Sequence, residues 1–487
     1  MASEDPLEIP EITGLVASYL SEKDLAHCVR VSKKWRDLFL PHRWRIVCAG
    51  FKPTKCPLKH SHRLRVGPHP SDIYGHRHLI HQLILVGETA GLDKYHYPNL
   101  RRLCLFQWLK DPEQEVLLEL TEMFPSLVNL GIGDVKLASS SWKALVVHPH
   151  VTTLALYSAK IKETDALLLW EVCRKLESLE LHRVTFSSGI IPEGAAFDSL
   201  RKLMIVDPRN MDISNQLNLI LRCPNLEKLY WAGLEIASNR PIPHINRLVK
   251  GCWPHLRHLC ILQWFGDMHV ATILEGIGHG SLVNLALAKC FLTKQGSKAL
   301  RVHFDMLVVL DFQDCCYVAS SVIRDVLCSC PKLIKLRARS VPATDIVKGG
   351  PWVCRRLREL RICFLFEKSE KDLQRDVFGH LSTLTRLERL EMSAPEHEPY
   401  EDVGILEFRL ENGMGQLGTL QQLAHLRFDS KSDAHLPQMG KNEVVWMLYN
   451  WKQLKTIRGR LNRESNEDEN LKDVFKRLGV EILQGLR

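Results

Sequence analysis

Apolar residues recur along most of this chain in one spaced phrase, Leu-x-x-Leu-x-Leu or a close variant. Clear copies begin at Leu100, Leu127, Leu176, Leu282 and Leu357. The alternation after the second leucine predicts a short strand with one buried face, and the segments between copies have the apolar spacing of helices. The first apolar position of each copy falls at residues 100, 127, 151, 176, 200, 226, 256, 282, 307, 333, 357, 387, 423 and 454, after a weaker copy at 80.

One such unit cannot bury its own apolar face, so stacked neighbours must share a core. The phrase, repeated in steps of mostly 24 to 27 residues, resembles the leucine-rich repeat. That resemblance implies an α/β solenoid with parallel strands on its concave face and helices on its convex face. We expect about 14 to 15 units over residues 79–487, ending in a cap with a helix over 471–478 and a strand around 480–482. The segment over residues 393–422 is longer than a standard unit, and its acidic opening, PEHEPYED (395–402), is predicted to be a projecting loop, whereas residues 463–470 are predicted to be a surface loop.

The turn after each strand commonly carries an asparagine or cysteine that hydrogen-bonds the backbone. Cys290 and Cys315 occupy this position in two copies. Val135, Val184 and Leu234 occupy it in others, so those turns must satisfy their backbone groups in another way.

A separate pattern precedes the repeats, from Leu7 to Trp44, in the sequence LEIPEITGLVASYLSEKDLAHCVRVSKKWRDLFLPHRW. Its apolar residues follow helical spacing. Pro10 suits a first helical turn, because its missing N–H would be unpaired there. Ser21 is predicted to close the first helix, and Asp24 to cap the second.

This block resembles an F-box, the helical module that docks onto the Skp adaptor of cullin-RING ubiquitin ligases. With the repeats, the whole chain resembles F-box proteins with leucine-rich repeats, of fungal-like type. We expect a three-helix F-box-like domain over residues 1–46, a linker or capping segment over 47–78, and then the solenoid. The adaptor-facing or domain-forming residues, two roles that sequence does not separate, are Leu7, Pro10, Ile12, Val16, Leu20, Leu25, Val31 and Trp35.

Strand residues between the leucines are expected on the concave face, because strand side chains alternate. From Leu333 onward these positions are rich in basic residues, which suit carboxylate or phosphate ligands. An acidic or phosphorylated client segment is one hypothesis, and charges that serve solubility alone are the other. The basic candidates are Lys335, Arg337, Arg339, Arg361, Arg389, Arg427, Arg458 and Arg460.

Composition narrows the function class. The net charge of +9 raises nucleic-acid binding, but no reading module accompanies it, so no specific nucleic-acid partner is expected. No phosphate-binding Gly-rich loop, nucleophile elbow or His-Glu-x-x-His helix is present, so we expect no catalysis and no cofactor. Cys48, Cys56, His60 and His62 do not have the spacing of a zinc site, so no metal is expected.

The fifteen cysteines, often at apolar repeat positions, indicate reduced thiols in the cytoplasm and/or nucleus. Neither a secretory signal nor a membrane span is expected. The predicted function is substrate recognition in a Skp-cullin-F-box (SCF) ubiquitin ligase, in which the first helices bind the Skp adaptor and the repeats hold a client protein. The alternative is a leucine-rich interaction scaffold with no role in ubiquitination.

Overall fold

The computed structural model divides into two compact units, residues 1–226 and residues 227–487. Unit 1 and unit 2 are described separately below. The residues described are 7, 9–49, 65–66, 70–86, 95–106, 115–116, 119–134, 136–187, 191–192, 194–233, 245, 251–367, 372–393, 403–429, 438–462 and 464–483.

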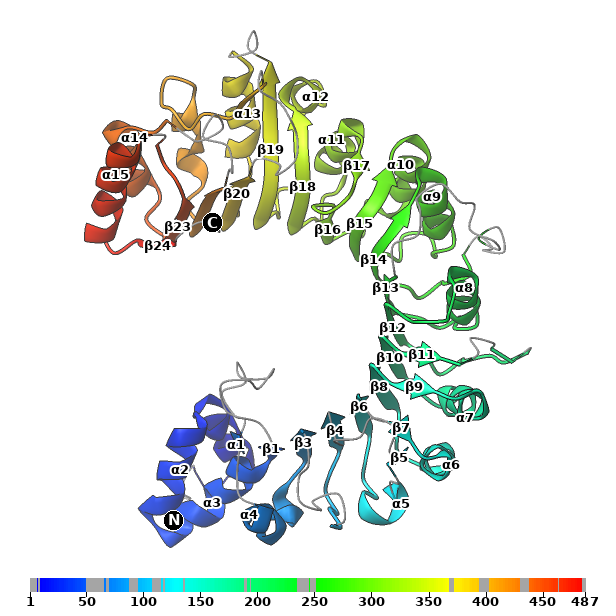
Figure 1. Ribbon diagram of the computed structural model, residues 1–487. Coiled ribbons are helices and arrows are strands. Elements are labelled where there is room, and N and C mark those ends of the chain that lie inside the picture. Colours follow the sequence, from blue (N-terminus) through cyan, green and yellow to red (C-terminus); the bar gives the residue numbers. More distant parts are fainter. Residues whose placement is uncertain are drawn as a thin grey trace, which may run out of the picture. The chain divides into compact units, whose positions relative to one another are not determined.

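Unit 1 begins with three helices and continues as a parallel sheet whose helices lie along one side (Figure 1). The initial helices are α1 (Pro10–Tyr19), α2 (Glu22–Val31) and α3 (Lys33–Trp44). The sheet strands are β1 (Ile46–Ala49), β2 (Arg65–Val66), β3 (Gln82–Val86), β4 (Arg102–Phe106), β6 (Asn129–Gly133), β8 (Thr153–Tyr157), β10 (Ser178–His182) and β12 (Lys202–Val206). The further helices are α4 (Pro70–Gly75), η3 (Arg77–Leu79), α5 (Leu120–Met123), α6 (Ser139–Val147), α7 (Glu163–Cys173) and α8 (Ile213–Leu221), and short strand pairs join β5 (Glu115–Val116) to β7 (Lys136–Leu137) and β9 (Lys160–Ile161) to β11 (Thr185–Phe186).

The second leucine of each phrase sets the register of the unit 1 sheet. Leu103, Leu130, Leu154 and Leu179 are direct partners on successive parallel strands. Each is at most 1% exposed, because each packs toward the helices. The predicted leucine-rich α/β arrangement is therefore confirmed for unit 1. The opposite face of the sheet, turned away from the helices, is called the open face of the unit.

The sheet of unit 1 starts earlier than the repeat phrase indicated. Strand β1 follows α3 after a single residue and pairs with β3, so the expected segment over residues 47–78 contributes strands to the sheet. The backbone N–H groups of His81 and Gln82 both donate to the Arg45 carbonyl oxygen at 3.0 Å. Trp44 is buried and stacks on His76, with ring centroids 4.3 Å apart. The helical block is thus joined directly to the first strands.

Unit 2 repeats the same strand-and-helix alternation (Figure 1). Its strands are β13 (Lys228–Ala232), β14 (His258–Phe265), β15 (Asn284–Leu292), β16 (Val309–Asp311), β17 (Tyr317–Val318), β18 (Lys335–Pro342), β19 (Glu359–Glu367), β20 (Arg389–Ser393), β21 (Val403–Ile405), β22 (His425–Asp429), β23 (Thr456–Gly459) and β24 (Glu481–Leu483). Its helices are α9 (Asp267–Glu275), α10 (Lys294–Leu300), η6 (Arg301–His303), α11 (Ser320–Ser329), α12 (Ala343–Val347), α13 (Leu373–Ser382), η7 (Met414–Thr419), α14 (Lys441–Asn450) and α15 (Ser465–Arg477).

The long segment over residues 393–422 contains β21, which runs antiparallel to β19, and the helical turn η7. Its acidic opening, the expected loop over residues 395–402, lies outside the described residues. One segment of unit 2 differs from the sequence prediction. Helix α15 begins at Ser465, inside the expected surface loop, because polar residues serve its first turn. Glu467 and Asp468 favour the positive helix start, and buried Asp468 accepts the Leu461 N–H at 2.6 Å.

Two described turns without asparagine or cysteine contain a positive-φ residue directly after the strand, and the Cys290 turn also has one, Lys289, with a φ of 58°. Ser158 and Arg183 directly follow strands β8 and β10, and each has a φ of 52°. Their N–H groups donate to the carbonyl oxygens of His182 and Val206 at the end of the next strand, both at 2.7 Å. This geometry leaves Val184 free to pack as a fully buried side chain. Val135 and Leu234 lie outside the described residues.

Cysteines play the predicted hydrogen-bonding role in two turns of unit 2. The Cys290 thiol donates to the Gln263 carbonyl oxygen at 3.3 Å, and the Cys315 thiol donates to that of Leu287 at 3.1 Å. Burial raises the pKa of Cys290 to about 12 and also raises the pKa of Cys315. Both thiols are therefore neutral packing residues.

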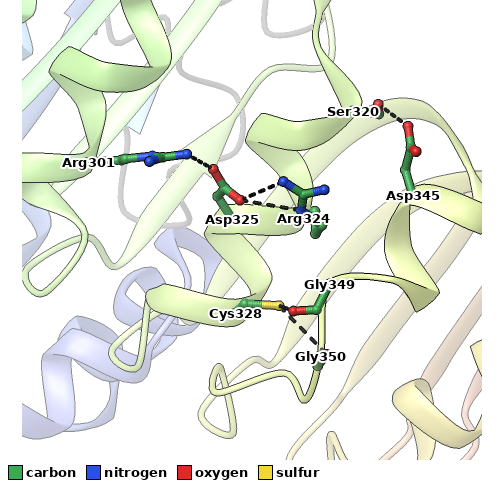
Figure 2. A network of polar contacts seen from close by, with 8 residues as sticks. All are labelled: Arg301, Ser320, Arg324, Asp325, Cys328, Asp345, Gly349 and Gly350. Atoms are coloured by element: carbon green, nitrogen blue, oxygen red, sulfur yellow. Dashed lines mark hydrogen bonds and ion pairs between the residues drawn. The ribbon is translucent and has the colours of Figure 1, made fainter. Parts of the chain in front are cut away.

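Polar side chains join neighbouring helices of unit 2 (Figure 2). Helix α11 is bound on both sides. Ser320 at its start donates to Asp345 of α12, and the Cys328 thiol near its end donates to a carbonyl oxygen that follows α12, at 3.2 Å. Toward the preceding repeat, Asp325 accepts from Arg301. Each of these bonds links consecutive repeats, so the network holds their spacing.

Candidate protein-binding surfaces

Helix α1 carries a row of exposed apolar side chains. Ile12, Leu15 and Tyr19 follow one another at intervals of three and four residues, so they share one side of the helix. They are 36%, 59% and 83% exposed, and Ile9 just before the helix is also exposed. We call these four residues the α1 apolar face. Apolar side chains grouped in this way indicate a surface that a partner covers.

The other side of α1 packs into a small core. Ala17 lies in one buried cluster with Leu25, Val29 and Phe39 from α2 and α3. Since this block is short, its core alone is small, and the contact of α3 with β1 extends it. The buried cluster and the α1 apolar face are therefore two distinct sets of residues.

Serine side chains define where the second and third helices begin. Ser21 is the N-cap of α2: its hydroxyl accepts the Asp24 N–H, and Asp24 reaches back to the Ser21 N–H in a capping box. The prediction that Asp24 itself caps α2 is therefore wrong, because the two residues act as a pair. Ser32 caps α3 by accepting the Trp35 N–H at 3.1 Å.

The structure shows which of the candidate residues in the helical block form its core and which are exposed to a partner. Leu25 is a core residue, 2% exposed. The half-buried residues Val16, Leu20 and Trp35 pack against that core. The exposed ones are Pro10, Ile12 and Val31, while Leu7 is half-buried and its carbonyl oxygen accepts the Thr13 hydroxyl.

Sequence reasoning omitted Ile9, Leu15 and Tyr19 from the candidate set. The signal was present, since Leu15 and Tyr19 stand three and seven residues after Ile12. The same spacing describes both faces of an amphipathic helix, so it required the structure to show which face packs inward.

All eight predicted basic residues of unit 2 lie between the buried strand positions and are half-buried. Register places four charged side chains in one row across successive strands: Arg337, Arg361, Glu391 and Arg427 are direct partners in that order. Arg458 continues the row on β23. Four of the eight predicted basic residues, Arg337, Arg361, Arg427 and Arg458, therefore share this row, whereas Arg460 lies directly after β23.

Carboxylates neutralise much of this row. Lys335 Nζ lies 2.9 Å from Glu359 Oε2, and Arg337 Nη1 lies 3.5 Å from Asp311 Oδ2. Asp311 comes from β16, one strand before the segment that the sequence marked as cationic. The cationic character of this face is therefore lower than the residue count indicated.

Glu391 is shared between two arginines. Its Oε2 lies 3.7 Å from Arg361 Nε and 3.7 Å from Arg427 Nη1. Arg361 also donates to Gln313 Oε1 at 2.7 Å. Because the Glu391 side chain is only 11% exposed, water replaces little of this contact.

The remaining candidates differ from one another. After Arg337 the register shifts, so that Ser340 rather than Arg339 pairs with Cys363 of β19, and the Arg339 guanidinium donates to the Cys315 carbonyl oxygen at 3.0 Å. Within the described part of the chain, Arg389 and Arg458 have neither an ion pair nor a hydrogen bond through their side chains.

The open face of unit 1 has another chemistry. The row that corresponds to the arginine row consists of Ile84, Cys104, Gly131, Ala155 and Glu180 on successive strands. The first four are small or apolar and largely buried.

Aromatic rings lie beside this row. The rings of Phe106 and Tyr157 are 5.5 Å apart, and Tyr157 stacks on His182 at 4.7 Å. Gly133 lies on the strand between Phe106 and Tyr157, and its missing side chain leaves the room that the Phe106 ring fills. The sequence analysis did not single out this aromatic group.

Glu180 is the acidic centre of the unit 1 open face. Its carboxylate lies 2.5 Å from Lys202 Nζ and 3.7 Å from His182 Nε2, and it accepts the Tyr157 hydroxyl at 3.4 Å. The neighbouring His182 and Lys202 lower the pKa of Glu180 to about 2. Burial, with Glu180 beside it, raises the pKa of Tyr157 to about 12. Glu180 is therefore a compensated anion.

Of the four residues considered as metal ligands and not expected to form a site, only Cys48 belongs to the described residues. Cys48 is buried in an apolar cluster with Ile84 and Cys104, while Cys56, His60 and His62 lie outside the described residues. No group of three or more potential metal ligands occurs among the residues that the structure describes. In the same part of the chain, no helix has the length and hydropathy needed to cross a membrane.

Comparison with known proteins gives one family match and several structural likenesses. A family model described as F-box-like matches residues 10–49. The crystal structure of the mouse RP105/MD-1 complex is similar over 83% of this chain and 69% of that chain, with 15% identity and a TM-score of 0.45. The crystal structure of the TLR13-ssRNA13 complex is similar over 86% of this chain and 63% of that chain, with 13% identity and a TM-score of 0.38. No curated protein matches the chain.

Proposed function

Because an F-box-like domain at the N-terminus precedes stacked leucine-rich repeats, we propose that this protein is the substrate-recognition subunit of an SCF-type ubiquitin ligase. The α1 apolar face docks onto the Skp adaptor, and through it onto the cullin-RING ligase. The open faces of the repeats hold a client protein for ubiquitination. The chain itself performs no chemistry in this proposal.

The observation that carries the proposal is the α1 apolar face. Leu15 and Tyr19 are mostly exposed although the same helix buries Thr13 and Ala17. Burying one large apolar side chain contributes about 1.5–3 kcal/mol, so covering several supports a stable helix-in-groove contact. Leu15 and Tyr19 therefore supply the binding energy, while Leu25 maintains the fold that presents them.

The junction between helices and sheet gives the proposal its geometry. Strand β1 follows α3 directly and pairs with β3, and the Trp44–His76 stack fixes the same joint. An adaptor bound to α1 is thus held at a defined orientation to the first strands of unit 1. Positioning of this kind accelerates transfer by raising the effective concentration of client lysines near the ubiquitin-carrying enzyme.

The proposed compartment is the cytoplasm and/or nucleus. The described cysteines are free thiols, including Cys173 and Cys223, and many of them are buried. Free buried thiols agree with a reducing environment.

The decisive experiment is co-purification of the full chain with the Skp adaptor. We expect Leu15→Asp to reduce adaptor recovery at least about tenfold, because the charge would be buried in the contact. Leu167→Asp is the matched control, since Leu167 on α7 is 60% exposed and lies outside the F-box-like domain. It should leave recovery unchanged.

A Pro10→Ala/Ile12→Ala variant and a Leu25→Ala variant separate contact from fold. The first should weaken adaptor binding with little change in melting temperature, whereas Leu25→Ala should lower stability by about 2–5 kcal/mol. Absence of the adaptor from the wild-type pull-down would refute the proposal. Adaptor binding without accumulation of any client on deletion would instead favour the interaction scaffold.

A further inference from the structure

The charge row on the open face of unit 2 follows a simple rule over its first strands. Each cation there has a carboxylate from the neighbouring strand: Asp311 for Arg337, Glu359 for Lys335, and Glu391 for Arg361. In this part of the face, the chain supplies its own anions.

The rule stops after strand β20. Arg427 lies 3.7 Å from the Glu391 carboxylate that Arg361 also contacts, and the next residue of the row, Arg458, has no anion within the described part of the chain. Arg389, on β20, lies opposite Glu359, and its charge helps to lower the pKa of Glu359, but the Glu359 carboxylate forms its ion pair with Lys335. We call Arg389, Arg427 and Arg458 the β20–β23 arginine cluster.

Arg458 shows the deficit most clearly. Its Nε is buried from solvent and has no hydrogen-bond acceptor among the described residues. A buried donor without an acceptor is unfavourable, particularly when the group is charged. Arg458 is also the direct register partner of Arg427, so two like charges face each other on adjacent strands. An external anion would relieve both defects.

We propose that the β20–β23 arginine cluster binds an acidic protein segment, whose Asp or Glu carboxylates continue the alternation of charge that ends at Glu391. This inference rests on the proposed function, because the segment would belong to the client. Arginine forks bind carboxylates with two parallel N–H···O bonds. The ion pairs of Asp311 and Glu391 show that arginines of this face already pair with carboxylates.

The dimensions of the cluster favour a short extended segment. Strands β20, β22 and β23 are consecutive in the sheet, and neighbouring strands are about 4.8 Å apart, so the cluster spans about 10 Å. An extended peptide covers that distance in about three residues. Carboxylates two or four residues apart share one side of an extended segment, so such a pair reaches Arg389 and Arg458 together.

The flanking charges oppose a long polyanion. Glu359 and Glu391 lie on the strand positions beside the cluster, and Glu481 is exposed on the strand after β23. A nucleic-acid backbone requires a continuous basic surface for its regularly spaced phosphates. The interrupted row instead suits a peptide with a few local carboxylates.

The test uses the full chain and a fluorescently labelled twelve-residue peptide in which glutamates alternate with serine and glycine. Fluorescence anisotropy should show saturable binding that weakens as salt increases. A peptide with glutamine in place of every glutamate should not bind. An Arg389→Gln/Arg458→Gln variant should bind the acidic peptide about tenfold more weakly.

Two controls make the result specific. Arg102→Gln removes an exposed arginine from the open face of unit 1 and should leave the affinity unchanged. Arg458→Lys keeps the charge without the fork and should bind with intermediate affinity. Arg389→Gln/Arg458→Gln should change the melting temperature little, because Arg458 has no anion among the described residues and Glu359, which faces Arg389, keeps its ion pair with Lys335.

Other results would overturn the inference. If the Arg389→Gln/Arg458→Gln variant binds the acidic peptide as tightly as wild type, the cluster is not the binding site. The same follows if the glutamine peptide binds wild type as tightly as the acidic peptide does. Binding only after the glutamates are replaced by phosphoserine would show that phosphate is the ligand instead. Leu15→Asp should abolish adaptor recovery but not peptide binding, so failure of the adaptor proposal remains distinguishable.

Discussion

The open faces of units 1 and 2 use the same position of the repeat phrase, but that position is mostly apolar in unit 1 and mostly charged in unit 2. In unit 1 the central row is apolar and ends at Glu180, next to the stacked rings of Tyr157 and His182. In unit 2 the equivalent row runs through Arg337, Arg361 and Glu391. The leucines that build the sheet point to the helices, so the outward positions can change without cost to the core.

The two faces are consequently stabilised by different forces. Ring contacts and close packing around Gly133 hold the face of unit 1. Cross-strand ion pairs such as Lys335–Glu359 hold that of unit 2, and these leave an unbalanced arginine at Arg458. The first face is suited to apolar contact and the second to anions.

Alanine at one strand glycine of each unit should give the largest difference. Gly459 ends β23 with a φ of 104°, and an added Cβ would overlap the Phe428 carbonyl oxygen. Gly459→Ala should therefore cost about 3 kcal/mol, because the backbone itself must move. Gly133→Ala should cost about 1 kcal/mol, since the Phe106 ring must turn away and Tyr157 must move slightly, whereas no backbone atom is in the way. Urea unfolding followed by circular dichroism measures both, and equal costs would contradict this account.

Removal of the shared carboxylate in unit 2 should have the next largest effect. Glu391→Gln leaves Arg361 and Arg427 without their anion in a largely buried position, and we expect a loss of about 2 kcal/mol. Glu388→Gln is the control, because the Glu388–Arg358 pair is about half exposed. It should cost less than about 0.5 kcal/mol in the same denaturation assay. A similar loss in both variants would show that burial does not matter here.

Protonation of Glu180 in unit 1 at acid pH should have the smallest effect of the three on stability. The pKa of Glu180 is lowered from 4.5 to about 2, so its contribution is complete above pH 4.5 and is lost as the pH falls toward 2. We expect a loss of about 1–2 kcal/mol over this window after allowance for solvent screening. Comparing the pH dependence of the unfolding free energy of wild type and Glu180→Gln isolates the contribution of Glu180. Parallel curves would contradict this contribution.

Much of the fold follows from the sequence because its signals are local and repeated. The leucine phrase predicted the strands, and all its first apolar positions, such as Leu100 and Leu333, are buried. The first-turn proline and helical spacing predicted the F-box-like helices. The start of α15 was missed, because a polar first turn resembles a loop when only hydrophobic periodicity is considered.

The candidate sites were less accessible to sequence reasoning. Asp311 and Arg337 are separated by a whole repeat, so their pairing depends on strand register rather than on proximity in the chain. Arg339 is displaced from its expected pairing with Cys363 by a register shift in β18, which no composition pattern signals. On α1, only packing against α3 showed that Leu15 is exposed while Ala17 is buried.

The sequence by itself determined the repeated strand-and-helix unit, the helical block before it and the residues available on each strand. Those properties depend on periodicity along a single segment. Tertiary structure alone decided which charges cancel, since Glu391 serves Arg361 and Arg427 from separate strands while Arg458 receives no carboxylate among the described residues. Electrostatic balance is a property of neighbours in space, and stacking of the repeats creates those neighbours.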